Sequence, residues 1–165
     1  MKTRILGLDP GLRTTGWGII ETEDNRLSYI GHGLIKPDPD LDLPYRLKHL
    51  LAEVQNLVQT YNPDEAAVEE TFVNANASSA LKLGQARGVI LVAPASCGLL
   101  VAEYTANQVK KSVVGAGHAD KAQVMAMIKI LLPGSGVMTS DAADALAVAI
   151  CHAHFRTTAK RWEVA

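Results

Sequence analysis

The chain has 165 residues, a formal net charge of −1, and 48% hydrophobic residues. This length predicts a single domain, residues 1–165, that buries its own core. No apolar run approaches the ~20 residues of a membrane-spanning helix, and the start lacks the apolar stretch of a signal peptide, so we expect a cytoplasmic protein without membrane contact. Cys97 and Cys151 have no ligand-like spacing, and we expect both to be buried free thiols.

Charge is distributed unevenly along the chain. Residues Ile20–Glu70 hold 11 acidic and 4 basic side chains, a balance of −7, whereas Ala75–Ser135 hold 2 acidic and 6 basic ones, a balance of +4. A net charge near zero argues against a protein that coats nucleic acid through a uniformly basic surface. One region could still hold a metal and another a polyanion, or the surface could simply be solvated unevenly.

Hydrophobic periodicity and turn residues predict an α/β domain with a five-stranded mixed sheet flanked by helices. An antiparallel hairpin comes first, and parallel crossovers follow. Lys110 and Lys111 lie in a short basic segment to which we assign no element. The predicted elements, in chain order, are strands at Arg4–Leu8, Thr15–Thr22 and Arg26–Lys36, a helix between Pro44 and Asn62, a strand at Glu65–Phe72, a helix at Ser78–Ala93, a strand at Leu99–Thr105, and helices at Asp120–Leu132 and Asp141–Phe155.

Small residues recur every four positions in one predicted helix, at Ala80, Gly84 and Gly88. Such a stripe allows close approach of another backbone. The partner could be a second copy of the chain in a dimer, or the chain's own sheet, and the sequence leaves both open.

The stretch "MTSDAADALAVAIC" carries two aspartates at the start of a run that otherwise reads as buried. Asp141 and Asp144 are three residues apart and therefore share one face of the predicted helix, with Ser140 as its N-cap. Acids at a helix start are common because the helix dipole favours them. That explanation suits Asp141 better than Asp144.

Other carboxylates stand at strand ends. Asp9 closes the first strand before a Pro-Gly turn, and either Glu69 or Glu70 must face inward from the strand in "AVEETF". Converging buried carboxylates are unfavourable without a cation, and Mg²⁺ prefers such oxygen ligands. The residues alone indicate either a site of one or two Mg²⁺ ions or scattered cap and turn acids.

Four long segments resemble the RuvC family of bacterial Holliday-junction resolvases: "ILGLDPGLRTTGWGII", "AVEETFVNANASSALKLGQARG", "EYTANQVKKSVVGAGHADKAQV" and "DAADALAVAICHAH". The resemblance is collinear from about Ile5 to His154. It implies a ribonuclease-H-like fold, a homodimer, and cleavage of four-way DNA junctions by paired nicks in recombination and repair. It also implies two Mg²⁺ ions per subunit, replaceable by Mn²⁺, and a branch-migration motor complex as a partner.

The resemblance assigns roles to individual residues. The family's four metal-binding and catalytic acids fall on Asp9, Glu69, Asp141 and Asp144. Phe72 matches an aromatic that stacks on an unpaired base, although it could equally be a core residue at a strand end. The implied basic residues are Lys110 and Lys121 near the scissile phosphate, with Lys121 also catalytic, and Arg13, Lys82, Arg87 and Lys111 on backbone phosphates.

Two other functions compete with this interpretation. The segment "GLDPGLRTTG" resembles the phosphate-binding hairpin of actin-like ATPases, but those proteins enclose a nucleotide between two such domains. A junction-binding module without catalysis is the second alternative. It would be expected to lack part of the acid set, and all four acids are present.

Overall fold

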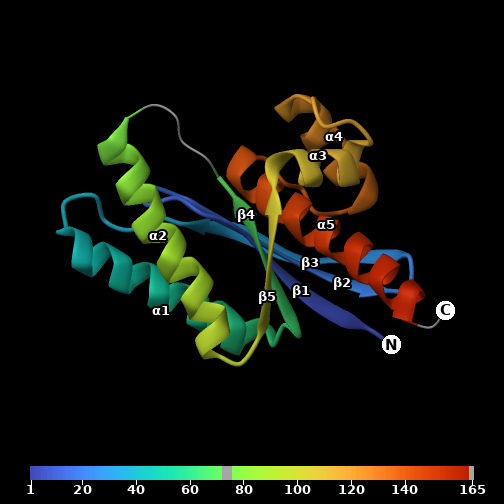
Figure 1. Cartoon of the computed structure of the whole chain (residues 1–165), viewed down its shortest axis with the longest axis horizontal. Coiled ribbons are helices and arrows are strands. Elements are labelled where there is room, and N and C mark those ends of the chain that lie inside the picture. Colours follow the sequence, from blue (N-terminus) through green and yellow to red (C-terminus); the bar gives the residue numbers. More distant parts are fainter. Residues whose placement is uncertain (72–75, 164–165) are drawn as a thin grey trace.

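The computed structural model describes residues 1–71 and 76–163, with side chains up to residue 156. Over these residues, five strands form one sheet and five helices pack on its two faces (Figure 1). The elements are β1 (Thr3–Asp9), β2 (Thr15–Glu23), β3 (Arg26–Ile35), α1 (Leu43–Tyr61), β4 (Glu65–Glu70), α2 (Ala77–Ser96), β5 (Leu100–Thr105), α3 (Ala106–Val114), α4 (Lys121–Leu131) and α5 (Ser140–Glu163).

The sheet has the strand order β3-β2-β1-β4-β5. β1, β2 and β3 pair antiparallel, and β4 pairs parallel with both β1 and β5. Parallel pairing needs a crossover, which α1 supplies before β4 and α2 supplies before β5. The prediction of a mixed sheet that begins with an antiparallel hairpin is confirmed.

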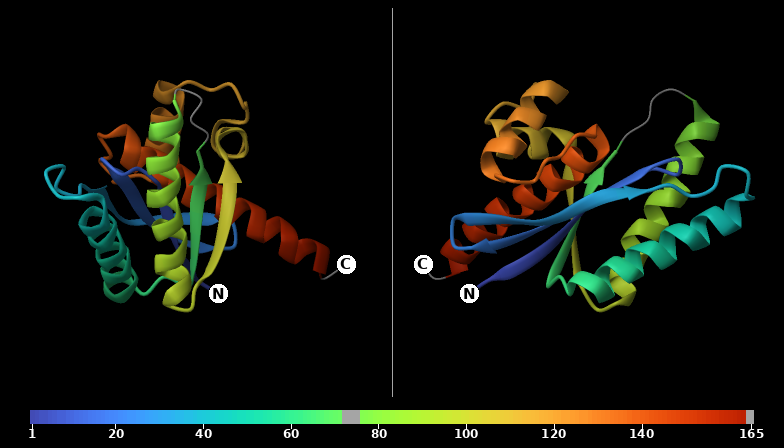
Figure 2. Two further views of the ribbon diagram at one scale, coloured as in Figure 1. Left: turned by 60° about the vertical axis from the view of Figure 1, so that its left-hand side comes forward. Right: turned by 180° about the vertical axis from the view of Figure 1, so that it is seen from behind.

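Side chains alternate along the central strands and divide the core into two layers. Leu6, Leu8 and Ile19 face α1 and α2, whereas Ile5 and Ile20 face α5. Figure 2 shows α1 and α2 together on one side of the sheet, with α5 crossing the other side beside α3 and α4. The predicted catalytic acids all belong to the α5 side of the sheet or to α5 itself.

The sequence analysis missed one helix and misjudged another's length. α3 occupies the basic segment left unassigned, because Thr105 and Gln108 form a reciprocal capping box and the helix buries Val109 and Val113. α5 begins one residue before its predicted start and continues past Phe155 to Glu163. β4 ends at Glu70, and the predicted end at Phe72 falls outside the described residues.

Two further expectations are corrected by burial. Cys151 is buried as predicted, but Cys97 is exposed, because it follows the last turn of α2 at the surface. The stripe of Ala80, Gly84 and Gly88 is also exposed, and a Cβ added at either glycine would meet nothing within 4 Å. The alternative that this stripe packs on the chain's own sheet is therefore wrong. Helix α2 instead turns a different face, with Ala86, Ile90 and Ala93, into the core.

No helix in the described part of the chain is long and apolar enough to cross a membrane.

Candidate active site

Glycines bring the start of α5 directly onto the ends of β1 and β2. Gly16 pairs with Asp9 in the β1–β2 register, and a Cβ at Gly16 would overlap the backbone of Asp141. A Cβ at Gly7 would likewise overlap the backbone carbonyl of Ala145, one turn further along α5. Only glycine permits this approach, so these two positions set the height of α5 above the sheet.

The four predicted acids converge at this point from three elements. Asp9 is the last residue of β1, and Glu69 lies near the end of the adjacent parallel strand β4. Asp141 and Asp144 occupy the beginning of α5, and all four side chains are partly buried. Glu69 is the glutamate of this strand whose charge acts on Asp9.

Mutual repulsion and burial perturb the carboxyl groups of Asp9, Glu69 and Asp144. Burial, followed by the charges of Glu69, Asp144 and Asp141, raises the pKa of Asp9 to about 8. Burial and the charge of Asp144 raise the pKa of Glu69 to about 7. Burial also raises the pKa of Asp144. Near neutral pH the metal-free site therefore retains a proton between Asp9 and Glu69.

Two lysines from neighbouring helices counter this negative charge. Lys110 lies on α3 and Lys121 begins α4, where a capping box between Asp120 and Gln123 fixes the helix start. Both ammonium groups act to lower the pKa of Glu69 and of Asp144, which places them within electrostatic reach of the acids. Helix α3 is the element that brings Lys110 to this position, and the role of the two lysines stays a prediction.

The donor set suits a hard divalent cation. Among the side chains described in residues 1–71 and 76–156, no three acids, histidines or cysteines enclose a metal position by themselves. The acids do interact closely, and their raised pKa values mark a cluster that favours added positive charge. Mg²⁺ keeps several water ligands and needs only one or two protein carboxylates for each ion, so the residues fit Mg²⁺.

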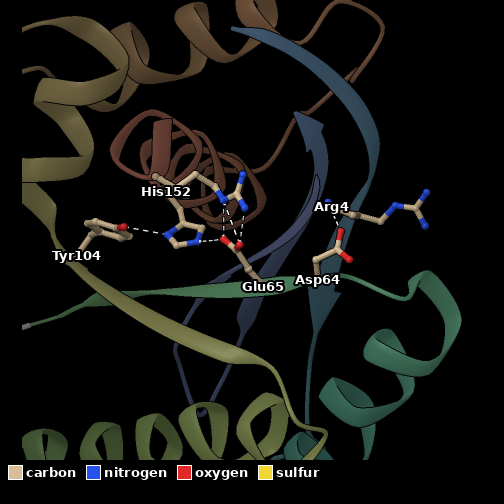
Figure 3. Close-up of polar contacts among 6 residues, drawn as sticks. Arg4, Asp64, Glu65, Tyr104 and His152 are labelled. Atoms are coloured by element: carbon tan, nitrogen blue, oxygen red, sulfur yellow. Dashed lines mark hydrogen bonds and ion pairs between the residues drawn. The ribbon is translucent and has the colours of Figure 1, made fainter. Parts of the chain in front are cut away.

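A polar network beside the active site ties α5 to β4, and the sequence analysis did not find it (Figure 3). Glu65, the first residue of β4, accepts hydrogen bonds from His152 Nε2 at 2.7 Å and from Arg156 Nη2 at 2.7 Å. Tyr104 Oη lies 2.8 Å from His152 Nδ1. Because Nε2 of the neutral ring donates to Glu65, Nδ1 accepts the hydrogen bond from the Tyr104 hydroxyl. Burial lowers the pKa of His152. Burial alone would raise the pKa of Glu65, but the hydrogen bonds from Arg156 and His152 outweigh it and lower that pKa.

This network joins β4 and α5, two of the three elements that carry the acids. Glu69 lies four residues after Glu65 on β4, and the aspartates lie at the start of α5, whereas His152 and Arg156 lie in its middle part. The only sequence signal was the spacing of His152 and Arg156, four residues apart on a predicted helix and its extension. Nothing in the sequence linked them to Glu65.

Comparison with known proteins identifies the family of this chain. The family profile described as crossover junction endodeoxyribonuclease RuvC matches residues 5–152. The crossover junction endodeoxyribonuclease RuvC of Paramagnetospirillum magneticum is 60% identical over 158 residues, which cover 96% of this chain and 95% of that protein. The chain belongs to the RuvC family.

Solved structures agree with this assignment. Thermus thermophilus RuvC in complex with a Holliday junction substrate superposes with a TM-score of 0.88 at 30% identity, covering 95% of this chain and 96% of that one. The yeast mitochondrial Holliday junction resolvase Ydc2 shares only the fold, with a TM-score of 0.67 at 12% identity over 97% of this chain and 86% of that one. The predicted RuvC family, ribonuclease-H-like fold and endonuclease class are confirmed.

The remaining predicted DNA contacts differ in their surroundings. Arg13, Lys82 and Lys111 are exposed on the β1–β2 turn, α2 and α3. Arg87 is instead held in an ion pair with Glu103 of β5, so its charge is already engaged. Phe72 lies outside the described residues.

Proposed function

We propose that this RuvC-family chain resolves four-way DNA junctions by Mg²⁺-dependent hydrolysis of one phosphodiester in each of two equivalent strands. The observation that carries the proposal is the cluster of four acids where β1, β4 and α5 meet. Its members are Asp9, Glu69, Asp141 and Asp144. Buried acids that raise one another's pKa values are costly to maintain, and a cationic cofactor removes that cost.

The four acids are the groups that would hold Mg²⁺, two ions per subunit, with Mn²⁺ as a substitute. Bound Mg²⁺ would lower the pKa of a water nucleophile and stabilise negative charge on the leaving 3′-oxygen. The protein itself fixes the relative positions of the acids. Asp9 and Glu69 come from adjacent strands locked in register, and Asp144 comes from a helix whose height two glycines set. A proton shared between Asp9 and Glu69 must leave when the cation binds.

Lys121 and Lys110 supply positive charge at the same corner. Lys121 is exposed and Lys110 is half-buried, and both lie within electrostatic reach of Glu69 and Asp144. We assign Lys121 to charge on the phosphate in the transition state and Lys110 to positioning of the scissile phosphate.

The proposed DNA contacts beyond the site are electrostatic. Arg13, Lys82 and Lys111 are exposed and would contact backbone phosphates. Arg87 can do so only by leaving Glu103, which makes it the weakest member of the set. Stacking of Phe72 on an unpaired base remains a proposal that rests on family resemblance.

A homodimer would pair two active sites on a two-fold symmetric junction. The α2 face around Gly84 and Gly88 supports this, because it is open and carries exposed apolar side chains, including Leu81 at 64% and Val92 at 59% exposure. We propose this face as the dimer contact. A branch-migration motor complex as partner and a cytoplasmic location are retained from the family resemblance and the composition alone.

Cleavage of a synthetic four-way junction tests the proposal. Wild-type protein should produce symmetric paired nicks with Mg²⁺ and none with chelator, while Asp144→Asn should bind the junction without cutting it. If both proteins bind and neither cuts with Mg²⁺ or Mn²⁺, the chain is a junction-binding module. ATP-dependent phosphate release without nicking would support the actin-like alternative.

A further inference from the structure

Two rows of side chains face each other between β4 and α5. Along β4 every second residue belongs to the α5 side of the sheet, because Ala67 lies in the core layer under α5 while Ala66 and Val68 lie in the other layer. The row on β4 consists of Glu65, Ala67 and Glu69. Along α5, residues four apart share one face of the helix. The row on α5 consists of Asp144, Val148, His152 and Arg156.

The two rows run in opposite directions and have nearly the same spacing. At one end the charge of Asp144 acts on Glu69, and at the other end His152 donates to Glu65. A helix rises about 1.5 Å per residue, so the path from Asp144 to His152 along α5 is roughly 12 Å. A strand rises about 3.3 Å per residue, so the path from Glu65 to Glu69 along β4 is roughly 13 Å. The contact made at one end therefore determines which residues meet at the other.

The middle of this contact is apolar and offers little that interlocks. Ala67 and Val148 are both fully buried in the core layer between the sheet and α5. The other buried residues of α5 are mostly alanines: Ala142, Ala143, Ala145, Ala147, Ala149 and Ala153. Apolar burial is not directional, and a methyl side chain presents a smooth surface. Burial therefore holds α5 on the sheet but specifies its position along β4 only weakly.

Directional contacts are found at the Glu65 end of the two rows. Arg156 Nε lies 3.0 Å from Glu65 Oε1 and 2.8 Å from Oε2, and its Nη2 lies 2.7 Å from Oε1. His152 Nε2 adds a further hydrogen bond at 2.7 Å, and Tyr104 of β5 holds the other side of the ring (Figure 3). The side chains of His152, Glu65 and Arg156 are only 12%, 17% and 19% exposed. Several charge-assisted hydrogen bonds to one carboxylate fix orientation as well as distance.

We propose that the hydrogen-bonded contact at Glu65 sets the register of α5 along β4, and with it the separation of Asp144 from Glu69 in the metal site. The positioning residues are Glu65, His152 and Arg156, which act through the two acids from the other end of the rows. Because a helix is stiff along its axis, any sliding of α5 at Glu65 is passed on to Asp144. The inference rests on the proposed function, because it takes the four acids as the groups that hold Mg²⁺.

Calorimetric titration of Mg²⁺ into the metal-free protein, at a temperature where every variant is folded, tests the proposal. Glu65→Gln removes the charge that Arg156 and His152 hold. It should weaken Mg²⁺ binding about tenfold, the lower end of the ~10–100-fold loss that follows removal of a group orienting a metal ligand. In single-turnover junction cleavage, the half-saturating Mg²⁺ concentration should rise by a similar factor. That rise should exceed any fall in the rate at saturating Mg²⁺, because the acids close around the cation once it is bound.

Two sets of variants separate positioning from a loss of stability. Val54 is fully buried on α1, in the core layer on the other side of the sheet, so Val54→Ala removes buried methyl groups without touching α5. It should lower Tm and leave Mg²⁺ affinity within about twofold of wild type. At His152, His152→Gln keeps an N–H that can reach Glu65, whereas His152→Leu does not. The glutamine variant should retain more Mg²⁺ affinity than the leucine variant, a difference that a role in packing alone would not produce.

The possible results distinguish this inference from the proposed function. If Glu65→Gln fails to fold, the comparison of His152→Gln with His152→Leu decides. Unchanged Mg²⁺ affinity in Glu65→Gln and His152→Leu, or an equal loss in Val54→Ala, would overturn the positioning role, and a wild type that cuts the junction would leave the proposed function intact. Weakened Mg²⁺ binding in these variants of a wild type that cuts no junction would support the positioning role and overturn the nuclease. A wild type that neither binds Mg²⁺ nor cuts the junction would overturn both.

Discussion

At Gly16, a single added methyl group should displace the start of α5 and thereby impair the active site. An alanine Cβ there would overlap the carbonyl group of Asp141 and come within 3.1 Å of the Ala142 nitrogen. These are backbone atoms, so the clash is relieved only if the start of α5 moves away from β2. A displacement on the order of 1 Å in a catalytic group costs about 100-fold in rate. Overpacking of this kind costs about 1–3 kcal/mol of stability, or ~2–4 °C in Tm for each kcal/mol.

Single-turnover junction cleavage and thermal melting measure the two effects of Gly16→Ala separately. We expect a rate about 100-fold below wild type at saturating Mg²⁺, with junction binding retained. Gly117→Ala is the control, because Gly117 has an ordinary backbone conformation and its nearest neighbour, the Asn107 carbonyl oxygen, lies 3.9 Å from the added Cβ. It should match wild type in both assays. A Gly16→Ala rate within twofold of wild type would refute the claim that this glycine sets the position of Asp141.

Three further predictions concern the charges and surfaces around the site. The raised pKa of Asp9 means that the metal-free protein loses stability as pH rises from about 4 to about 8, and Asp9→Asn should flatten this decline in a series of Tm measurements; a wild-type Tm that rises across that range would contradict it. Glu65→Gln should lower the free energy of unfolding by about 1–3 kcal/mol in denaturant titrations, because it disrupts the hydrogen bonds to His152 and Arg156. Lys2→Gln, which breaks a surface ion pair, should change it by less than about 1 kcal/mol. Equal effects of the two substitutions would contradict a stabilising role of the network. In sedimentation, Leu81→Lys on α2 should yield monomers and Ile130→Lys on α4, exposed by 67%, should not; a wild-type monomer would reject the proposed interface.

The central acids could be predicted because strand ends and a helix start are visible in the sequence. Asp9 precedes a Pro-Gly turn, and Asp141 and Asp144 open an apolar helical run. The choice between Glu69 and Glu70 needed family resemblance, since alternation along a strand does not say which face is the active one. The structure then places Glu69 beside Asp9.

Features that depend on distant contacts were beyond the sequence. The link from Glu65 to His152 and Arg156 spans 87 and 91 residues, and no local pattern marks it. The hydrogen bond from Arg46 to the carbonyl oxygen of Leu12 is similar, because it spans 34 residues. Helix α3 was a different kind of omission, since the Thr105–Gln108 capping box is a local signal that was present.

Calorimetric titration of Mg²⁺ into the metal-free protein, repeated in two buffers of different ionisation enthalpy near pH 7, tests the central claim most directly. If the acids of β1, β4 and α5 form the metal site, wild-type protein will bind Mg²⁺ with release of protons, because Asp9 and Glu69 share a proton before binding. Asp144→Asn should then weaken Mg²⁺ binding by at least about tenfold. Binding by Asp144→Asn with the affinity and proton release of the wild type would place the metal elsewhere and contradict the account.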